Sequence, residues 1–159
     1  MFKALQRCFD LVDAITQCLH DGAQFVIGHD ALPGHMAVIE TLHQFTDLLA
    51  GPGTFSVGDS NSFCLIRTVL DEAEVLTIAT DPAQRRRGFA RNVLQSAEEL
   101  ATARGAKEIF LEVAEDNLAA ISFYASSSYR QIGRRAGYYL PKDAAPIAAL
   151  VLRKSLATG

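Results

Sequence analysis

The chain has 159 residues, 49% of them apolar and 21% charged, and its formal net charge is −3. This length predicts one globular domain that buries roughly two-thirds of its unfolded surface. The acidic balance excludes a global basic field that would recruit nucleic acid. The start shows no signal-peptide pattern, and no apolar run approaches the roughly 18 residues of a membrane helix. We therefore expect a cytoplasmic protein that contacts no membrane.

The cysteines and histidines show no ligand spacing. Cys8, Cys18 and Cys64 are odd in number, which is typical of reduced thiols in a cytoplasm. The four histidines form no H-x-x-x-H pair. We therefore expect no metal site and no nucleophilic cysteine.

The first third of the chain is predicted to be mostly helical. Apolar residues at helical spacing indicate amphipathic helices over residues 2–20 and 36–50, with a short strand at 24–28 between them. Gly51-Pro52-Gly53 ends the second helix. No residue in this part carries a pattern that identifies a chemistry.

The middle of the chain changes to strands. Three apolar runs, at residues 54–57, 63–70 and 73–80, are separated by short polar turns, which predicts an antiparallel meander. A helix with apolar positions at 93, 94, 97, 100 and 101 follows Gly88, and Gly105 stands where its C-terminal cap belongs.

Four further elements complete the predicted fold. A strand over residues 108–114 follows the helix, so the strand-helix-strand unit predicts a right-handed crossover and a parallel pair. A helix over 117–126 and strands near 129–133 and 147–153 come next. The pattern indicates an α/β (α+β) domain with one core, a mixed sheet and helices on both faces.

The junction between the third strand and its helix has the composition of an anion site. Asp81-Pro82 ends the strand, and Arg85–Arg87 precede Gly88 and Ala90 at the helix start. The first helical turn leaves N–H groups without intrahelical partners, and small residues let a phosphate approach them. Hydrogen bonds to a charged group contribute roughly 1.5–3 kcal/mol each, so several could hold a diphosphate without a metal. The alternative is a solvated arginine run at a helix start.

Two common phosphate motifs are absent from the sequence. It contains neither the G-x-x-x-x-G-K-[ST] pattern of a P-loop nor a G-x-G-x-x-G dinucleotide fingerprint after a strand. A nucleotide-triphosphate or nicotinamide site is therefore not predicted.

A second group of residues follows the strand over 108–114. Asn117 is a good N-cap, and Ala120 and Tyr124 share its helix face at i+3 and i+7. Strand alternation places Glu112 opposite its apolar neighbours, in solvent or in a polar cleft. The residues alone leave two readings open for Glu112 and Tyr124: a functional pair, or a solvent-facing strand residue and a core aromatic.

These two groups together resemble a known superfamily. Arg85-x-x-Gly88-x-Ala90 is similar to the R/Q-x-x-G-x-G/A pyrophosphate loop of the GCN5-related N-acetyltransferases (GNAT). The runs Leu111-Glu112-Val113…Asn117…Ala120-Ile121…Phe123-Tyr124 and Gly133-Arg134-Arg135-x-Gly137-Tyr138-Tyr139 resemble a bacterial branch, the RimI-like ribosomal-protein-alanine N-acetyltransferases. The resemblance covers residues 45–152. It implies one GNAT domain over 1–159, with 1–44 as a divergent helical part.

The resemblance implies a fold and roles for particular residues. The central sheet would be mostly antiparallel with a splayed parallel strand pair, and acetyl-coenzyme A (acetyl-CoA) would lie in the V-shaped gap as co-substrate. Glu112 would be the general base and Tyr124 the general acid. Cofactor contacts would come from Ile78, Ala79, Thr80, Arg85, Arg86, Arg87, Gly88, Phe89, Ala90, Arg91 and Asn117.

The implied reaction is acetyl transfer to the N-terminal α-amine of a protein, with the alanine of a ribosomal protein as one candidate. An α-amine has a pKa near 7.7–8.0, so a mild base is enough at neutral pH. Two alternatives stay open: a GNAT enzyme of small amines or lysine, and a catalytically idle acyl-CoA-binding module. Tyr138 and Tyr139 are equally compatible with an acceptor groove or an edge strand. We expect a monomer or homodimer.

Overall fold

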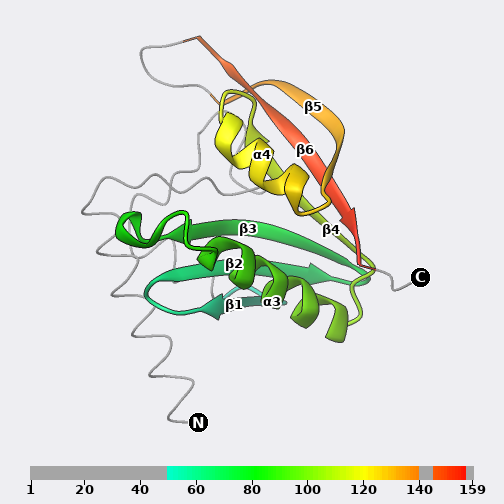
Figure 1. The fold of residues 1–159 in the computed structure, drawn as a ribbon. Helices are drawn as coiled ribbons and strands as arrows, with labels where there is room; N and C mark the ends of the chain where they lie inside the picture. The colour runs from blue at the N-terminus through cyan, green and yellow to red at the C-terminus, as the bar shows by residue number, and fades with distance from the viewer. Residues whose placement is uncertain (1–49, 140–144, 157–159) are drawn as a thin grey trace.

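The computed structural model describes residues 50–139 and 145–156, which form a six-stranded sheet with two helices (Figure 1). The strand order is β1-β2-β3-β4-β6-β5. The strands are β1 (Thr54–Gly58), β2 (Ser62–Val69), β3 (Glu72–Thr80), β4 (Glu108–Ala114), β5 (Arg130–Tyr139) and β6 (Ile147–Ser155). The helices are α3 (Phe89–Ala103) and α4 (Leu118–Ser126), with a short 3-10 turn η1 (Pro82–Gln84) before α3.

The predicted meander and crossover are both confirmed. β1, β2 and β3 pair antiparallel in sequence order. β3 and β4 pair parallel, and α3 makes the connection between them. All other neighbouring strands pair antiparallel, so the sheet is mixed and mostly antiparallel, as the sequence predicts.

α3 forms because its apolar residues repeat at helical spacing and have a sheet to cover. Val93, Leu94, Ala97 and Ala101 are all buried. The helix ends at Ala103, and Gly105 follows with φ of 98°, the left-handed geometry that glycine adopts without steric cost. No helix in the described part of the chain is long and apolar enough to cross a membrane.

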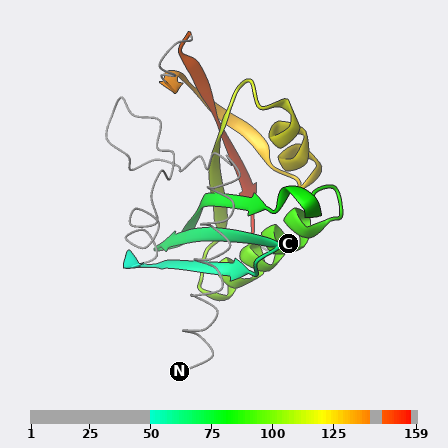
Figure 2. The same cartoon turned by 90° about the vertical axis from the view of Figure 1, so that its left-hand side faces the viewer.

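Both described helices cover the same face of the sheet (Figure 2). One buried cluster joins α3 residues to Tyr124 of α4 and to the strand residues Cys64, Ile66 and Ile109. The predicted helices over residues 2–20 and 36–50 and the strand over 24–28 lie outside the described residues, apart from Ala50.

β5 is longer than the sequence predicts. The expected strand near 129–133 runs from Arg130 to Tyr139 and pairs with β6, with irregular register between Gln131 and Gly133 and between Arg135 and Tyr139. Glycines and arginines give this stretch little strand propensity. Pairing with β6 supplies the missing hydrogen bonds, so the strand continues beyond its local signal.

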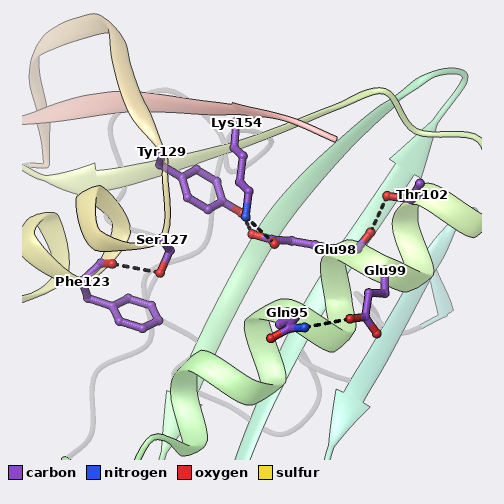
Figure 3. Close-up of polar contacts among 8 residues, drawn as sticks. All are labelled: Gln95, Glu98, Glu99, Thr102, Phe123, Ser127, Tyr129 and Lys154. Atoms are coloured by element: carbon purple, nitrogen blue, oxygen red, sulfur yellow. Dashed lines mark hydrogen bonds and ion pairs between the residues drawn. The ribbon is translucent and has the colours of Figure 1, made fainter. Parts of the chain in front are cut away.

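A buried polar network ties α3 to the C-terminal strand (Figure 3). Glu98 of α3 accepts a hydrogen bond of 3.0 Å from the Tyr129 hydroxyl and pairs with Lys154 of β6 at 2.6 Å. The side chains of Glu98 and Lys154 are 11% and 24% exposed. Because a buried charge without a partner is costly, each member of this network depends on the others.

We expect Glu98→Gln to lower the free energy of unfolding by about 2 kcal/mol, because it leaves the Lys154 ammonium without a counter-charge. The matched control is Glu99→Gln on the next residue, whose side chain accepts only an exposed hydrogen bond from Gln95. The control should stay within about 0.5 kcal/mol of the parent. Urea unfolding of both variants measures the difference, and equal stabilities would show that the network contributes nothing.

Ser128 adopts an unfavourable backbone conformation at the end of α4. Its φ is 71°, while its N–H donates to the Ala125 carbonyl and the next N–H, of Tyr129, donates to the Tyr124 carbonyl. These hydrogen bonds close the helix and hold a non-glycine residue in the left-handed region, which costs roughly 1–2 kcal/mol.

Ser128→Gly is therefore expected to raise the free energy of unfolding by about 1 kcal/mol, after allowance for the greater freedom of glycine in the unfolded chain. Ser127→Gly is the control, because Ser127 has φ of −100° and its hydroxyl donates to the Phe123 carbonyl. That change should destabilise the protein. Thermal unfolding of both variants tests the prediction, and a destabilising Ser128→Gly would contradict it.

Candidate functional site

The parallel pair β3–β4 opens into a gap. The two strands pair only where Glu72–Glu74 face Glu108–Phe110. Beyond that point β3 continues along β2 and β4 continues along β6, so the facing edges of β3 and β4 separate (Figure 1). Edge backbone groups of this kind can pair with an extended ligand.

The end of β3 directs alternate backbone groups into this gap. The Ala79 carbonyl accepts from the Ser62 hydroxyl at 2.9 Å, and the Asp81 N–H donates to the Asn61 carbonyl, so both point towards β2. Strand alternation therefore turns the backbone groups of Ile78 and Thr80 towards the gap. This favours Ile78 and Thr80 over Ala79 as the residues that would pair with a ligand's main chain.

The loop that follows β3 leads into the start of α3. The Asp81 carboxylate accepts from the Ala83 N–H at 2.8 Å and starts η1. Arg86 and Gly88 both have positive φ, 61° and 86°. Gly88 is the N-cap of α3 without a side-chain cap, and a Cβ added there would meet nothing within 4 Å. The backbone around Gly88 is thus open to a ligand.

A cavity of about 250 Å³ lies at this loop. Beside the cavity, the start of α3 is joined to α4 by a hydrogen bond of 2.9 Å that Arg91 donates to the Ser126 hydroxyl. Positive charge and free helix N–H groups at one place favour an anion such as a diphosphate. The lining residues are Thr80, Gln84, Arg85, Arg86, Gly88, Phe89, Ala90, Arg91 and Phe123.

Arg87 does not line this cavity. Its guanidinium donates to the Gln84 side chain and lies 5.8 Å from the centre of the Phe89 ring. Of the three predicted arginines, Arg85 and Arg86 therefore line the cavity, whereas Arg87 contacts Gln84 and Phe89 of the loop and helix start.

Glu112 lies on the face of β4 opposite the helices. Its neighbours Leu111 and Val113 are buried in the core cluster, as strand alternation predicts. The Glu112 side chain is only 5% exposed, and its Oε1 accepts from Arg135 of β5 at 2.8 Å. Within the described residues its other oxygen, Oε2, is buried without a hydrogen-bond partner. A buried carboxylate oxygen with unused lone pairs is the kind of atom that takes up a proton during a reaction.

Tyr124 approaches from the helix side. It is buried on α4 and makes an edge contact with Tyr129, with ring centres 5.6 Å apart. Burial raises the pKa of the Tyr124 hydroxyl, and the nearby Cys64 and Tyr139 raise this pKa further. The hydroxyl therefore stays protonated well above neutral pH and can donate.

Tyr139 interacts electrostatically with both predicted catalytic residues, Glu112 and Tyr124. Its hydroxyl is buried without a hydrogen-bond partner in the described part of the chain. Burial raises its pKa, and the next largest cause is the Glu112 carboxylate. Tyr139 is also one of the groups that raise the pKa of Tyr124.

A second cavity, of about 420 Å³, lies on the Glu112 face of the sheet. Apolar side chains and an ion pair of 2.8 Å between Arg67 and Glu74 line it. The lining residues are Arg67, Val69, Glu72, Ala73, Glu74, Phe110, Leu111, Glu112, Ile132 and Val151. The structure thus has two cavities, an anion cavity at the start of α3 and a separate one that Glu112 lines.

Asn117 acts as the predicted N-cap, and its side-chain oxygen accepts from the Ala120 N–H at 3.1 Å. The sequence predicts no role for Arg135, because the strand predicted near 129–133 ends before it. Its place near Glu112 depends on the pairing of β5 with β6, for which residues 130–139 carry no local signal.

Comparison with known proteins finds consistent relatives. Residues 44–129 match the acetyltransferase (GNAT) family model. N-alpha-acetyltransferase RimI of Mycobacterium tuberculosis is 34% identical over 132 residues, 77% of each chain. The [ribosomal protein bS18]-alanine N-acetyltransferases of Escherichia coli K12 and Haemophilus ducreyi are 35% and 33% identical, and the chain spans 58% and 63% of their lengths.

Solved structures share the fold. The E. coli ribosomal-protein-S18-alanine N-acetyltransferase matches with a TM-score of 0.66 and 27% identity over 75% of this chain and 79% of that one. Arabidopsis thaliana NAA60 in complex with acetyl-CoA matches with a TM-score of 0.69 over 91% and 92% of the two chains. At 17% identity, this second likeness concerns the fold alone.

Proposed function

The chain belongs to the acetyltransferase (GNAT) family, and from this premise we propose that it transfers the acetyl group of acetyl-CoA to the N-terminal α-amine of a protein. The observation that carries the proposal is the β3–β4 gap, with an anion cavity at the start of α3 and, on β4, a buried Glu112 oxygen that has no partner among the described residues. We take residues 1–159 as one catalytic domain.

Acetyl-CoA fits the residues present at the α3 start. Its diphosphate would lie over Gly88, where no side chain intrudes, with Arg85, Arg86 and Arg91 around it. Its extended pantetheine arm would pair with the edge of β3 at Ile78 and Thr80. Phe89, Ala90 and Asn117 would complete these contacts. The solved NAA60 neighbour holds acetyl-CoA, which supports the same co-substrate here.

The side chains at the other end of the gap have suitable chemistry. Acetyl-CoA supplies an activated thioester. Glu112 would accept a proton from the incoming amine, directly or through a water molecule, and the nitrogen would form the new bond to the acetyl carbon. As the carbon–sulfur bond breaks, Tyr124 would donate its proton to the leaving sulfur. No covalent enzyme intermediate is needed, so buried Cys64 has no chemical role.

The acceptor is proposed from the relatives. The bS18-alanine N-acetyltransferases are named for a ribosomal protein's alanine, and the mycobacterial relative for α-amines. We therefore place a protein N-terminus, with alanine at its first position, in the cavity that reaches Glu112. An α-amine with a pKa near 7.7–8.0 suits a carboxylate base at neutral pH.

The test is acetyl-CoA turnover, followed by thiol release, with an alanine-starting ribosomal peptide, the same peptide blocked at its α-amine, a lysine peptide and simple polyamines. We expect turnover on the unblocked alanine peptide only. Turnover on lysine or polyamines would move the acceptor class to side-chain or small amines. Tight acetyl-CoA binding by calorimetry with no turnover on any acceptor would indicate an acyl-CoA-binding module instead.

A further inference from the structure

The ion pair between Glu112 and Arg135 spans three strands. Val151 of β6 is the register partner of Glu112 on β4 and of Gly133 on β5, and Arg135 lies two residues beyond Gly133. The guanidinium therefore reaches over β6 to bind Oε1 of Glu112 at 2.8 Å. The guanidinium also lies 4.7 Å from the centre of the Tyr138 ring, a cation–π contact.

The two partners differ sharply in burial. The Glu112 side chain is 5% exposed and the Arg135 side chain 43% exposed, so a half-exposed cation covers a buried carboxylate. A buried carboxylate is costly unless a cation is paired with it. Arg135 binds Oε1, and among the residues that the structure describes Oε2 has no hydrogen-bond partner.

The other charged groups around Glu112 do not replace Arg135. From β2 and β3, Arg67 forms its own pair with Glu74, and Glu72 adds a negative charge to the same cavity. On β5, burial and the nearby Glu112 raise the pKa of the Tyr139 hydroxyl, so this hydroxyl stays neutral. β6 presents the apolar Val151, and Asp116 after β4 is another carboxylate. Among the described residues, Arg135 is the cation bound to Glu112.

We propose that Arg135 is a positioning residue for the acetyl transfer, which holds the Glu112 carboxyl by Oε1 and thereby fixes Oε2 as the oxygen that receives the amine proton. This inference rests on the proposed function.

The test compares kcat and KM for the parent, Arg135→Met and Arg135→Lys, on the acceptor that the parent uses best. Without the guanidinium, the Glu112 carboxyl loses the hydrogen bond that fixes Oε1, so Oε2 no longer keeps one position. We expect Arg135→Met to lower kcat by about tenfold or more, while the KM for acetyl-CoA stays within about twofold of the parent. Arg135→Lys keeps the charge and should restore most of the parent kcat.

The control is Arg134→Met, the same change at the adjacent residue. Arg134 pairs with Glu115 at 2.6 Å, and both side chains are substantially exposed. Its kcat and KM should follow those of the parent. Circular dichroism and thermal unfolding of every variant show whether the fold is kept, and the ¹³C NMR line of the Glu112 carboxyl in the parent and in Arg135→Met reads the surroundings of that group without turnover.

The outcomes separate this inference from the proposed function. If Glu112→Gln keeps the parent rate, the general-base assignment fails and the Arg135 role fails with it. If Glu112→Gln is inactive but Arg135→Met keeps the parent kcat, or loses kcat only together with stability and acetyl-CoA affinity, Arg135 has no positioning role. An unchanged ¹³C line of the Glu112 carboxyl in Arg135→Met would overturn the inference even in the absence of any active acceptor.

Discussion

Glu112→Gln is expected to lower kcat by about 10²- to 10⁴-fold, the range that a lost general base produces. Glutamine keeps the size of the side chain and can still accept from Arg135, so the fold and the cavity should persist. Its amide cannot take up the amine proton. The affinity for acetyl-CoA, measured by calorimetry, should stay within about twofold of the parent, because the anion cavity at the α3 start does not include residue 112.

The matched control for this change lies four residues earlier on the same strand and face. Glu108 pairs with Arg153 at 3.2 Å, with side chains 36% and 47% exposed. Glu108→Gln should leave kcat within about twofold of the parent, since an exposed pair contributes little. A Glu112→Gln variant that turns over as fast as the Glu108→Gln control would remove Glu112 from the mechanism.

The parts of the fold that local sequence predicts are those with strong local signals. β4 alternates buried and partly exposed residues without a break, so Leu111 and Glu112 lie on opposite faces, as strand geometry predicts. Gly105 and Asn117 mark a helix end and a helix start, and both hold in the structure. Each of these features depends on residues only a few positions apart.

The site itself depends on contacts that local sequence does not determine. Arg134 and Arg135 are adjacent, and one pairs with Glu115 and the other with Glu112. A register shift of one residue on β5 would exchange the faces of the two arginines. β5 carries two such irregularities, so no pattern within residues 130–139 tells which arginine reaches the carboxylate.

The gap between β3 and β4 also depends on contacts that local sequence does not determine. A parallel pair is predicted from the strand-helix-strand order, but the number of residues that pair depends on where the strands diverge. Only three register pairs join β3 to β4, and β3 also shifts register against β2 between Leu65 and Ile66. The resemblance to the GNAT superfamily supplied the expectation of a splayed pair, and the register confirms it.

Tyr124→Phe is expected to lower kcat by about 100-fold, because the leaving sulfur loses its proton donor. Phenylalanine fills the same buried space, so the ring contacts with Phe123 and Tyr129 remain. The control is Tyr129→Phe, which also removes a buried hydroxyl but one that serves the Glu98 network. That control should cost about 1 kcal/mol of stability and leave kcat within about twofold.

The pH dependence of the Tyr124→Phe defect distinguishes a proton donor from a packing effect. A tyrosine with an ordinary pKa near 10 would lose half its proton at that pH, and the advantage of the parent would shrink. Burial raises the pKa of Tyr124, so its hydroxyl stays protonated and the rate ratio of parent to variant should be the same at pH 7 and pH 10. A ratio that falls by about half or more by pH 10 would mean that the hydroxyl ionises in this range, against the burial seen on α4. A ratio near one at every pH would remove Tyr124 from the proton transfer, and another group would have to protonate the leaving sulfur; the buried Tyr139 hydroxyl, without a hydrogen-bond partner among the described residues, is the candidate.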